Sequence, residues 1–148
     1  QISEISLKDG VKVKILCGTV NGMQGPVRDI ITDPEYLDIT VPGGTTFTQF
    51  IRPGQNAFAY VLEGEGYFDP IRDPYAHEVI GTNYFDFKRS CVCGNETIVL
   101  YGDGEEVAVT AEKGGVRFLL VSGKPIGEPV AWYGPIVMNT QEELKIAF

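Results

Sequence analysis

The sequence predicts a single all-β domain, a sandwich or barrel of short strands that ends in one short helix. Stretches of alternating apolar and polar residues follow one another closely along the 148 residues, and turns rich in Gly and Pro separate them. Hydrophobic residues make up 43% of the chain and charged residues 22%, which is typical of a globular domain with a buried core. Only the C-terminal end carries the capping pattern of a helix.

Four strands are predicted in the N-terminal half. Residues 11–16 alternate Val, Lys, Val, Lys, Ile and Leu, and this period of two indicates a strand with one solvated face. Residues 36–41 show the same period. Turns containing Pro and Gly then lead to a third strand at 45–51 and a fourth at 57–63.

The strand pattern weakens in the middle of the chain and then returns. The glycines in residues 64–66 predict a turn. Residues 69–95 are predicted to form a long irregular loop, because Pro, Asp and aromatic residues interrupt any alternation there. Strands are predicted again at 97–101, 107–110 and 116–122.

The segment 123–140 combines three prolines and three glycines with several large apolar residues. Proline fixes φ and lacks a backbone donor, so this segment is excluded from helix interiors and from central strands. We predict an ordered, extended strap whose apolar side chains pack on another part of the protein and seal one end of the barrel. A helix then begins at Thr140, which has capping-box spacing with Glu143, and Leu144 and Phe148 share one face.

Charge and cysteine content limit the classes of function. The net charge is −8 and Lys and Arg do not occur in runs, so we expect no direct nucleic-acid binding. No apolar stretch is long enough to cross a bilayer, so no membrane partner is expected. The three cysteines are an odd number, which predicts an intracellular, cytoplasmic protein without a disulfide framework. The absence of an initiating Met, and an end soon after a helix begins, predict a fragment of a longer protein.

Residues 44–64 resemble the first conserved motif of cupins. That motif spaces a glycine, a His-x-His pair, a Glu and a second glycine over two neighbouring strands, and Gly44 and Gly64 match its two glycines. In cupins the histidines and the glutamate converge on iron or manganese inside the barrel. Counted from the first glycine, the two His positions fall on Phe50 and Arg52.

The other ligand positions of the cupin motifs are also occupied by residues that do not bind metals. The Glu position falls on Asn56 or Ala57, and the His of the second motif, within residues 104–116, falls nearest to Gly115. The chain's one histidine, His77, lies in the long loop. A metal centre of the usual cupin kind cannot be assembled from these residues, so we expect no metal and no other cofactor in this chain.

The C-terminal part resembles the pirin family. Residues 123–129 read Gly-Lys-Pro-Ile-Gly-Glu-Pro, and residues 133–143 read Tyr-Gly-Pro-Ile-Val-Met-Asn-Thr-Gln-Glu-Glu. Pirins end their second domain with Gly-x-Pro-hydrophobic-x-Glu-Pro and then Gly-Pro-Phe-Val-Met-Asn-Thr-x-Glu-Glu, so Ile136 replaces the Phe. Residues 18–26 and 56–64 also fit, and the match leaves out roughly the long loop.

The resemblance implies a fold and a division of roles. Pirins are two cupin barrels in tandem, of which the first holds iron with three His and one Glu and the second usually has no metal. For residues 1–148 it therefore implies a single cupin-type jelly-roll barrel or sandwich, the second of the two. Iron is implied only in an N-terminal barrel of the parent protein. Some pirins oxidise quercetin, and eukaryotic pirins are nuclear cofactors of transcription regulators, but none of the family's catalytic residues maps onto this chain.

Two groups of residues are candidates for binding. The first is a pocket, because a small barrel can hold one ligand at its mouth. The favoured alternative is that no pocket forms, with Tyr60 filling the core and Arg52 lying at the rim of the barrel. The C-terminal segment is a candidate interface, with a pirin N-terminal barrel or a second copy as its partner. The candidate pocket consists of Gln49, Arg52, Asn56 and Tyr60. The candidate interface consists of Trp132, Tyr133, Met138, Asn139, Leu144 and Phe148.

The cysteines and the histidine offer a weaker metal hypothesis. Cys91 and Cys93 form a C-x-C pair that would bind a soft metal with the help of Cys17 or His77. Structural zinc needs four well-placed ligands and usually a C-x-x-C spacing, so free loop thiols are favoured. The histidine is expected to be a solvated surface residue.

Three functions follow from these patterns. The leading hypothesis is a metal-free pirin C-terminal domain with a structural, ligand-binding or partner-docking role. The second is a stand-alone cupin dioxygenase or isomerase with an unrecognised site. The third is an interaction module that acts through residues 123–148.

Overall fold

The computed structural model describes residues 2–80 and 89–148, in which strands predominate and one α-helix lies near the C-terminus. The elements, in chain order, are β1 (Ser3–Ser6), the 3-10 turn η1 (Lys8–Gly10), β2 (Lys12–Cys17), β3 (Thr19–Val20), β4 (Met23–Gln24), β5 (Glu35–Val41), β6 (Thr46–Phe50), β7 (Asn56–Tyr67), β8 (Val92–Cys93), β9 (Ile98–Leu100), β10 (Glu106–Gly123), β11 (Ala131–Tyr133), β12 (Ile136–Met138) and α1 (Gln141–Ala147).

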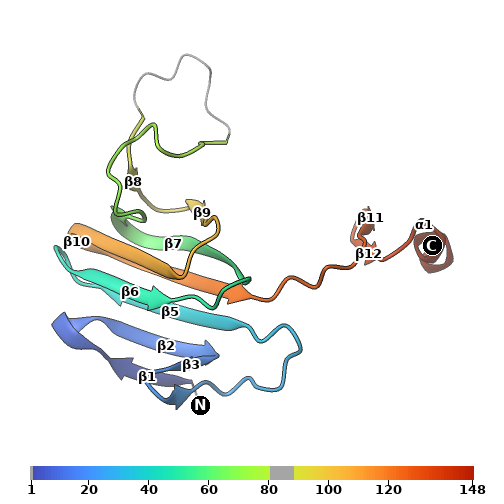
Figure 1. The fold of residues 1–148 in the computed structure, drawn as a ribbon, viewed down its shortest axis with the longest axis horizontal. Helices are drawn as coiled ribbons and strands as arrows, with labels where there is room; N and C mark the ends of the chain where they lie inside the picture. The colour runs from blue at the N-terminus through green and yellow to red at the C-terminus, as the bar shows by residue number, and fades with distance from the viewer. Residues whose placement is uncertain (1, 81–88) are drawn as a thin grey trace.

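The main sheet has eight antiparallel strands, and its order is open rather than circular (Figure 1). The path runs β1-β2-β5-β10-β7-β8, with β6 on β10 and β9 on β7. The second part of β10, residues 116–122, pairs with β5, whereas its first part, residues 106–110, pairs with β6. Both parts pair with β7. The sheet therefore folds back on itself as a sandwich of the expected all-β cupin type.

A bend in β7 and β10 carries both strands from one layer to the other. Their register shifts between residues 111 and 116 of β10, which is the sign of a bulge. Gly64 lies at this point with φ +74°, and a Cβ atom built on it would overlap the carbonyl oxygen of Gly115. The predicted turn at 64–66 is therefore wrong, because the glycines permit a bend within one continuous strand instead of reversing the chain. The predicted strands 107–110 and 116–122 are likewise two parts of β10.

The core lies between the two layers and follows the alternation expected from the sequence. In β5, Leu37, Ile39 and Val41 are fully buried, as their period predicted. Phe118 of β10 is at the centre, with its ring centroid 6.2 Å from that of Phe47 and 5.1 Å from that of Phe68, both in edge-to-face contact. These contacts join the β6 side of the sandwich to the β5 side.

The C-terminal residues leave the sandwich instead of packing on it. After β10, residues 124–148 form an arm in which β11, β12 and α1 contact one another and project away from the main sheet (Figure 1). Ile126, Val130 and Trp132 are 71%, 74% and 72% exposed. The expectation that the strap seals one end of the barrel is therefore wrong. Its prolines exclude it from the ladder, as predicted, but most of its large apolar side chains are left uncovered by the described chain.

The predicted capping box of the helix is confirmed. The Thr140 hydroxyl accepts a hydrogen bond from the Glu143 backbone N–H, and the Glu143 carboxylate accepts one from the Thr140 N–H. Leu144 is buried against the hairpin, and the rings of Tyr133 and Phe148 meet edge to face at 5.1 Å. The hairpin of β11 and β12 within the predicted strap was not expected.

Replacing Gly64 by Ala should destabilise the fold more than the same change at Gly44. Both glycines have φ +74°, but a Cβ atom at Gly44 meets nothing within 4 Å. Gly44→Ala should cost about 1 kcal/mol for the left-handed backbone alone. Gly64→Ala should cost at least ~2 kcal/mol more, because the layers must move apart at the bend. Urea unfolding of both variants measures the difference, and equal losses would show that the close approach of β7 and β10 is not a constraint.

Candidate polar site at one end of the sandwich

The two His positions counted from the cupin motif do not face the core. Side chains alternate between faces along a strand, and Phe47 and Ile51 are 3% and 4% exposed, whereas Phe50 is 59% exposed and Arg52 is exposed. The inward positions of this segment are therefore Gln49 and Ile51, one residue before those counted. A shift of one residue changes the face of every side chain.

The inward residues do not fit an iron centre. Gln49 offers an amide, and Ile51 and Ala57 offer only hydrocarbon, whereas a cupin metal requires imidazole and carboxylate ligands. Gly115 lies at the bend without a side chain. Within residues 2–80 and 89–148, no group of three or more His, Cys, Asp or Glu side chains is close enough to hold a metal ion. His77 is exposed in the long loop.

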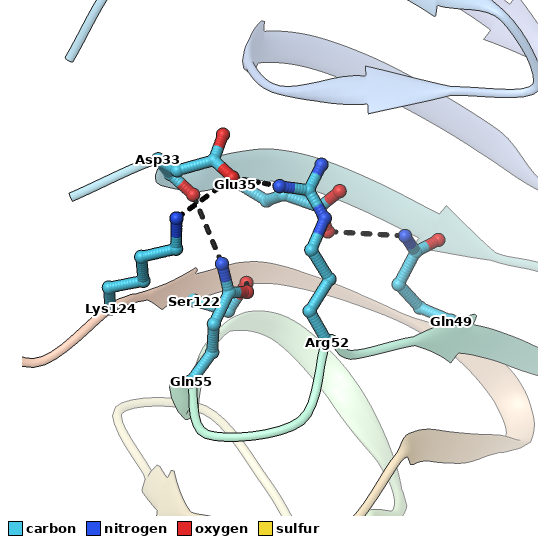
Figure 2. A network of polar contacts seen from close by, with 7 residues as sticks. All are labelled: Asp33, Glu35, Gln49, Arg52, Gln55, Ser122 and Lys124. Atoms are coloured by element: carbon cyan, nitrogen blue, oxygen red, sulfur yellow. Dashed lines mark hydrogen bonds and ion pairs between the residues drawn. The ribbon is translucent and has the colours of Figure 1, made fainter. Parts of the chain in front are cut away.

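A polar network lies at the end of the sandwich where the arm begins (Figure 2). Asp33, before β5, is its centre: its carboxylate pairs with Arg52 and lies 4.0 Å from the Lys124 ammonium. Its backbone carbonyl accepts a hydrogen bond of 3.3 Å from the Gln55 side chain. The Gln55 oxygen in turn accepts one of 3.4 Å from Ser122. The network thus joins two loops, the end of β10 and the start of the arm.

Glu35 is the buried carboxylate of this network. It is the first residue of β5 and lies in phase with the apolar inward positions, so its side chain enters the core side of the strand and is only 9% exposed. The Gln49 amide donates a hydrogen bond of 3.2 Å to it. Burial raises the pKa of Glu35 above its ordinary value, and the bond from Gln49 opposes this rise. The arrangement can bind or position a polar group.

The predicted pocket is only partly assembled. Gln49 and Arg52 belong to the network, whereas Asn56 is exposed at the start of β7 and Tyr60 faces outward beside Ile98 of β9. The favoured alternative placed Arg52 at the rim and Tyr60 in the core. Arg52 does lie at the rim, but Tyr60 does not fill the core. Sequence reasoning missed five members of the network. Those residues are Asp33, Glu35, Gln55, Ser122 and Lys124.

The outward face of the sheet carries an apolar surface, which we call the outer stripe. It crosses β9, β7, β10 and β5 through the cross-strand pairs of Phe58 with Leu100 and of Tyr60 with Ile98. Leu100 is 71% and Ile98 is 59% exposed. Arg117, which makes a bidentate pair with Asp38 at 2.9 and 2.8 Å, borders it. The outer stripe consists of Tyr36, Phe58, Tyr60, Ile98, Leu100, Leu119 and Val121.

Most of the candidate interface residues are exposed on the arm. Trp132, Tyr133 and Phe148 are 72%, 67% and 70% exposed. Asn139 is also exposed and donates a hydrogen bond of 2.6 Å to the Glu128 carboxylate, while Met138 is half-buried. Leu144 differs, because it is 4% exposed inside the hairpin–helix unit and cannot contribute an outer surface.

The fold is that of a cupin-type domain. A quercetin 2,3-dioxygenase from Acinetobacter baumannii matches 99% of this chain with a TM-score of 0.76, at 23% identity and over 44% of its own chain. An RmlC-like cupin from Shewanella frigidimarina matches 86% of this chain with a TM-score of 0.51, at 12% identity and over 87% of its own chain. At these identities the likeness shows the fold alone.

The particular family follows from the sequence match. Residues 36–148 match the pirin C-terminal cupin domain, so the chain belongs to the pirin family. Pirin-like proteins of Arabidopsis thaliana and Caulobacter vibrioides are each 36% identical over 140 residues, which is 93% and 94% of this chain. The chain spans about two fifths of these relatives, 40% and 43% of their length. Its described helix is too short to span a membrane.

Glu35→Gln should stabilise the domain at pH 7. Folding raises the pKa of Glu35 above its ordinary value of 4.5, so the stability that its protonated form supports is fully present below pH 4.5 and is lost as the pH rises through the raised pKa. Glutamine keeps a partner for Gln49 without the buried charge. Chemical unfolding at a series of pH values should show the advantage of the variant growing over this interval. Glu65→Gln, at an exposed position of β7, is the control. A pH-independent difference would contradict the assignment.

Proposed function

We propose that this chain is a metal-free C-terminal cupin domain of a pirin-like protein, with a structural and partner-docking role. The observation that carries the proposal is the arm, which holds a defined shape while leaving large apolar side chains exposed. We propose that the iron and the chemistry of the parent protein belong to an N-terminal barrel. By the family resemblance, the parent protein would oxidise quercetin or act as a transcription cofactor.

The side chains at the metal positions support the metal-free part of the proposal. An amide and two hydrocarbon side chains occupy the inward positions. The only buried carboxylate in the described core, Glu35, is held by Gln49. A carboxylate whose pKa is raised by burial is a weaker ligand at low pH, and a single such group does not make an iron site.

The arm supports the docking part of the proposal. Soluble monomers rarely expose large contiguous apolar patches, and aromatic residues such as Trp and Tyr are typical of interface centres. Trp132 donates its indole N–H to the Gly134 carbonyl at 2.6 Å, so its ring is already oriented within the free chain. Such preorganisation lowers the entropy cost of binding.

In this proposal, the partner that docks on the arm is the N-terminal cupin barrel of the parent protein. The chain spans about two fifths of its relatives, so the larger part of a pirin-like protein lies outside the matched region. The arm is connected to the sandwich through exposed residues 124–130, a span that lets it reach a neighbouring domain. The outer stripe is a second apolar surface that the same barrel would cover.

The metal-free proposal predicts that the purified 148-residue chain binds no stoichiometric iron and does not turn over quercetin. The physical reason is the missing set of imidazole and carboxylate ligands. Iron analysis after loading with ferrous iron, and a quercetin oxidation assay under the same conditions, measure both properties. Iron bound at one equivalent would contradict the proposal, and turnover would favour the stand-alone enzyme hypothesis.

The docking proposal predicts that the arm becomes buried when the N-terminal barrel is added. Fluorotryptophan incorporated at Trp132, the chain's one tryptophan, gives a single fluorine NMR resonance that reports on the arm alone. Addition of the part of the Caulobacter vibrioides relative that lies outside its match should shift this resonance. Tyr133→Ala and Met138→Ala should each weaken the interaction by at least about tenfold, the loss of an interface anchor.

The matched control is Ile31→Ala, which removes an apolar side chain that is 96% exposed in the loop before β5. It should leave the affinity unchanged. A shift that appears on concentrating the chain by itself would favour self-association over the barrel. An unchanged resonance in both experiments would remove the docking role.

A further inference from the structure

One edge of the main sheet has no role in the docking proposal. β6 pairs with β10 along one side, and within residues 2–80 and 89–148 no strand pairs with its other side, which we call the free edge of β6. A strand with an unpaired side presents backbone N–H and C=O groups that a further strand can bind. The free edge is therefore a candidate interaction surface.

The register of β6 on β10 identifies the backbone groups at the free edge. Ala111 donates its backbone N–H to the Thr45 carbonyl at 3.0 Å, just before β6. Ile51 donates its N–H to the Glu105 carbonyl at 2.8 Å, just after it. Because hydrogen-bonded and non-hydrogen-bonded pairs alternate in an antiparallel ladder, the odd-numbered residues of β6 bond to β10 and the even-numbered ones point their backbone groups away from it. Those even-numbered residues are Thr46, Thr48 and Phe50.

The side chains and the loop contacts agree with this assignment. Thr46 lies opposite Thr110, and their hydroxyl oxygens are 2.9 Å apart, as suits a non-hydrogen-bonded pair, in which side chains come closest. No backbone hydrogen bond from another segment of the described chain reaches Thr46, Thr48 or Phe50. The side chains of all three residues are exposed. Their backbone donors and acceptors are thus available to a partner strand.

β6 lacks the features that protect the other edge strands. Soluble proteins keep edge strands short, or interrupt them with charges, Pro or bulges. β8 has two residues and β9 has three, and β1 carries the charged Glu4. β6 has five residues, Thr-Phe-Thr-Gln-Phe, without a charge or a Pro, and its register on β10 is unbroken. This composition favours pairing with a strand that is likewise uncharged.

We propose that the free edge of β6 pairs with β6 of a second copy of the chain, in antiparallel register about a two-fold axis at Thr48. In this register Thr48 lies opposite Thr48 of the second copy, and Thr46 lies opposite its Phe50. All the even-numbered residues then form hydrogen-bonded pairs, each with two bonds. The two sheets continue into one another, and the symmetry is that of the commonest homodimers.

The strand is self-complementary in this register. The ring of Phe50, which is 59% exposed, lies beside the methyl group of Thr46 of the second copy, and such aromatic and β-branched pairs stabilise antiparallel strands. No like charges meet, because the strand has none. The dimer is weak, since one pair of short strands buries less than the ~1,200 Å² of a stable interface. Pairing at this edge leaves the arm and the outer stripe free, so the inference does not rest on the docking role.

Sedimentation of the 148-residue chain from about 10 µM to about 1 mM tests the proposal. A reversible dimer with a Kd below about 1 mM is expected. Amide hydrogen exchange over the same concentrations locates the contact. Exchange should slow with concentration at Thr46, Thr48 and Phe50. It should change little at Phe47 and Gln49, whose N–H groups already bond to β10.

Two substitutions at Thr48 separate the edge contact from the fold. Thr48→Pro removes an N–H that β10 does not use, so it should leave the chain folded and weaken the dimer by at least about tenfold. Thr48→Lys places two ammonium groups opposite each other at the two-fold axis, and it should weaken the dimer similarly without restricting the backbone. Thr19→Lys, at an exposed threonine of β3, is the matched control and should change nothing.

Three results would overturn the pairing of two copies. One is a chain that stays monomeric up to about 1 mM, and another is a dimer that both Thr48 variants leave intact. The third is protection of the even-numbered amides only when the Caulobacter vibrioides fragment is added, which would assign the free edge to the N-terminal barrel. The fluorine resonance of Trp132 should not respond to this dimer, so failure of the pairing and failure of the docking proposal are distinguishable.

Discussion

The structure depends on the pairing of β10 with three other strands. β10 is 18 residues long, and its two parts belong to different layers of the sandwich. Phe118 lies after the bend and packs on Phe47 and Phe68, so the same strand that joins the layers also fills the space between them. The bend requires close backbone approach at Gly64, where a side chain has no room. Because β10 ends at Gly123, it also sets the point at which the polar network forms and the arm begins.

Alternation predicted the strands that are solvated on one face and buried on the other. β2 and β5 match the predicted residues within one position, because their alternate apolar residues are buried between the layers. Alternation failed for the two-residue strands and for the hairpin of β11 and β12, which are too short to show a period. It also failed at 64–66, since the same glycines suit a reversal of the chain and a bulge within one strand.

The candidate site was harder to predict than the fold, because it depends on register. The cupin motif gave His positions that face outward, and one residue decides between the two faces of β6. The sequence analysis identified Gln49 and Arg52 as site residues. It missed Asp33 and Ser122, because the tertiary fold brings them to the network and no local sequence pattern encodes that arrangement. Glu35 did carry a signal, since it is a charged residue in phase with the buried positions of its strand. The outer stripe became visible only once the strands were paired.

The arm has a defined shape although it buries little apolar surface of its own. Its helix has seven residues, fewer than an isolated helix needs to be stable in water. The capping box, Leu144 and the contact of Tyr133 with Phe148 hold it on the hairpin, yet most of its aromatic surface stays exposed. Pro125 and Pro129 stiffen the connection and keep it out of the main sheet. A partner that covers the arm would add the apolar burial that the chain itself does not provide, so docking and local folding of the arm are coupled in our proposal.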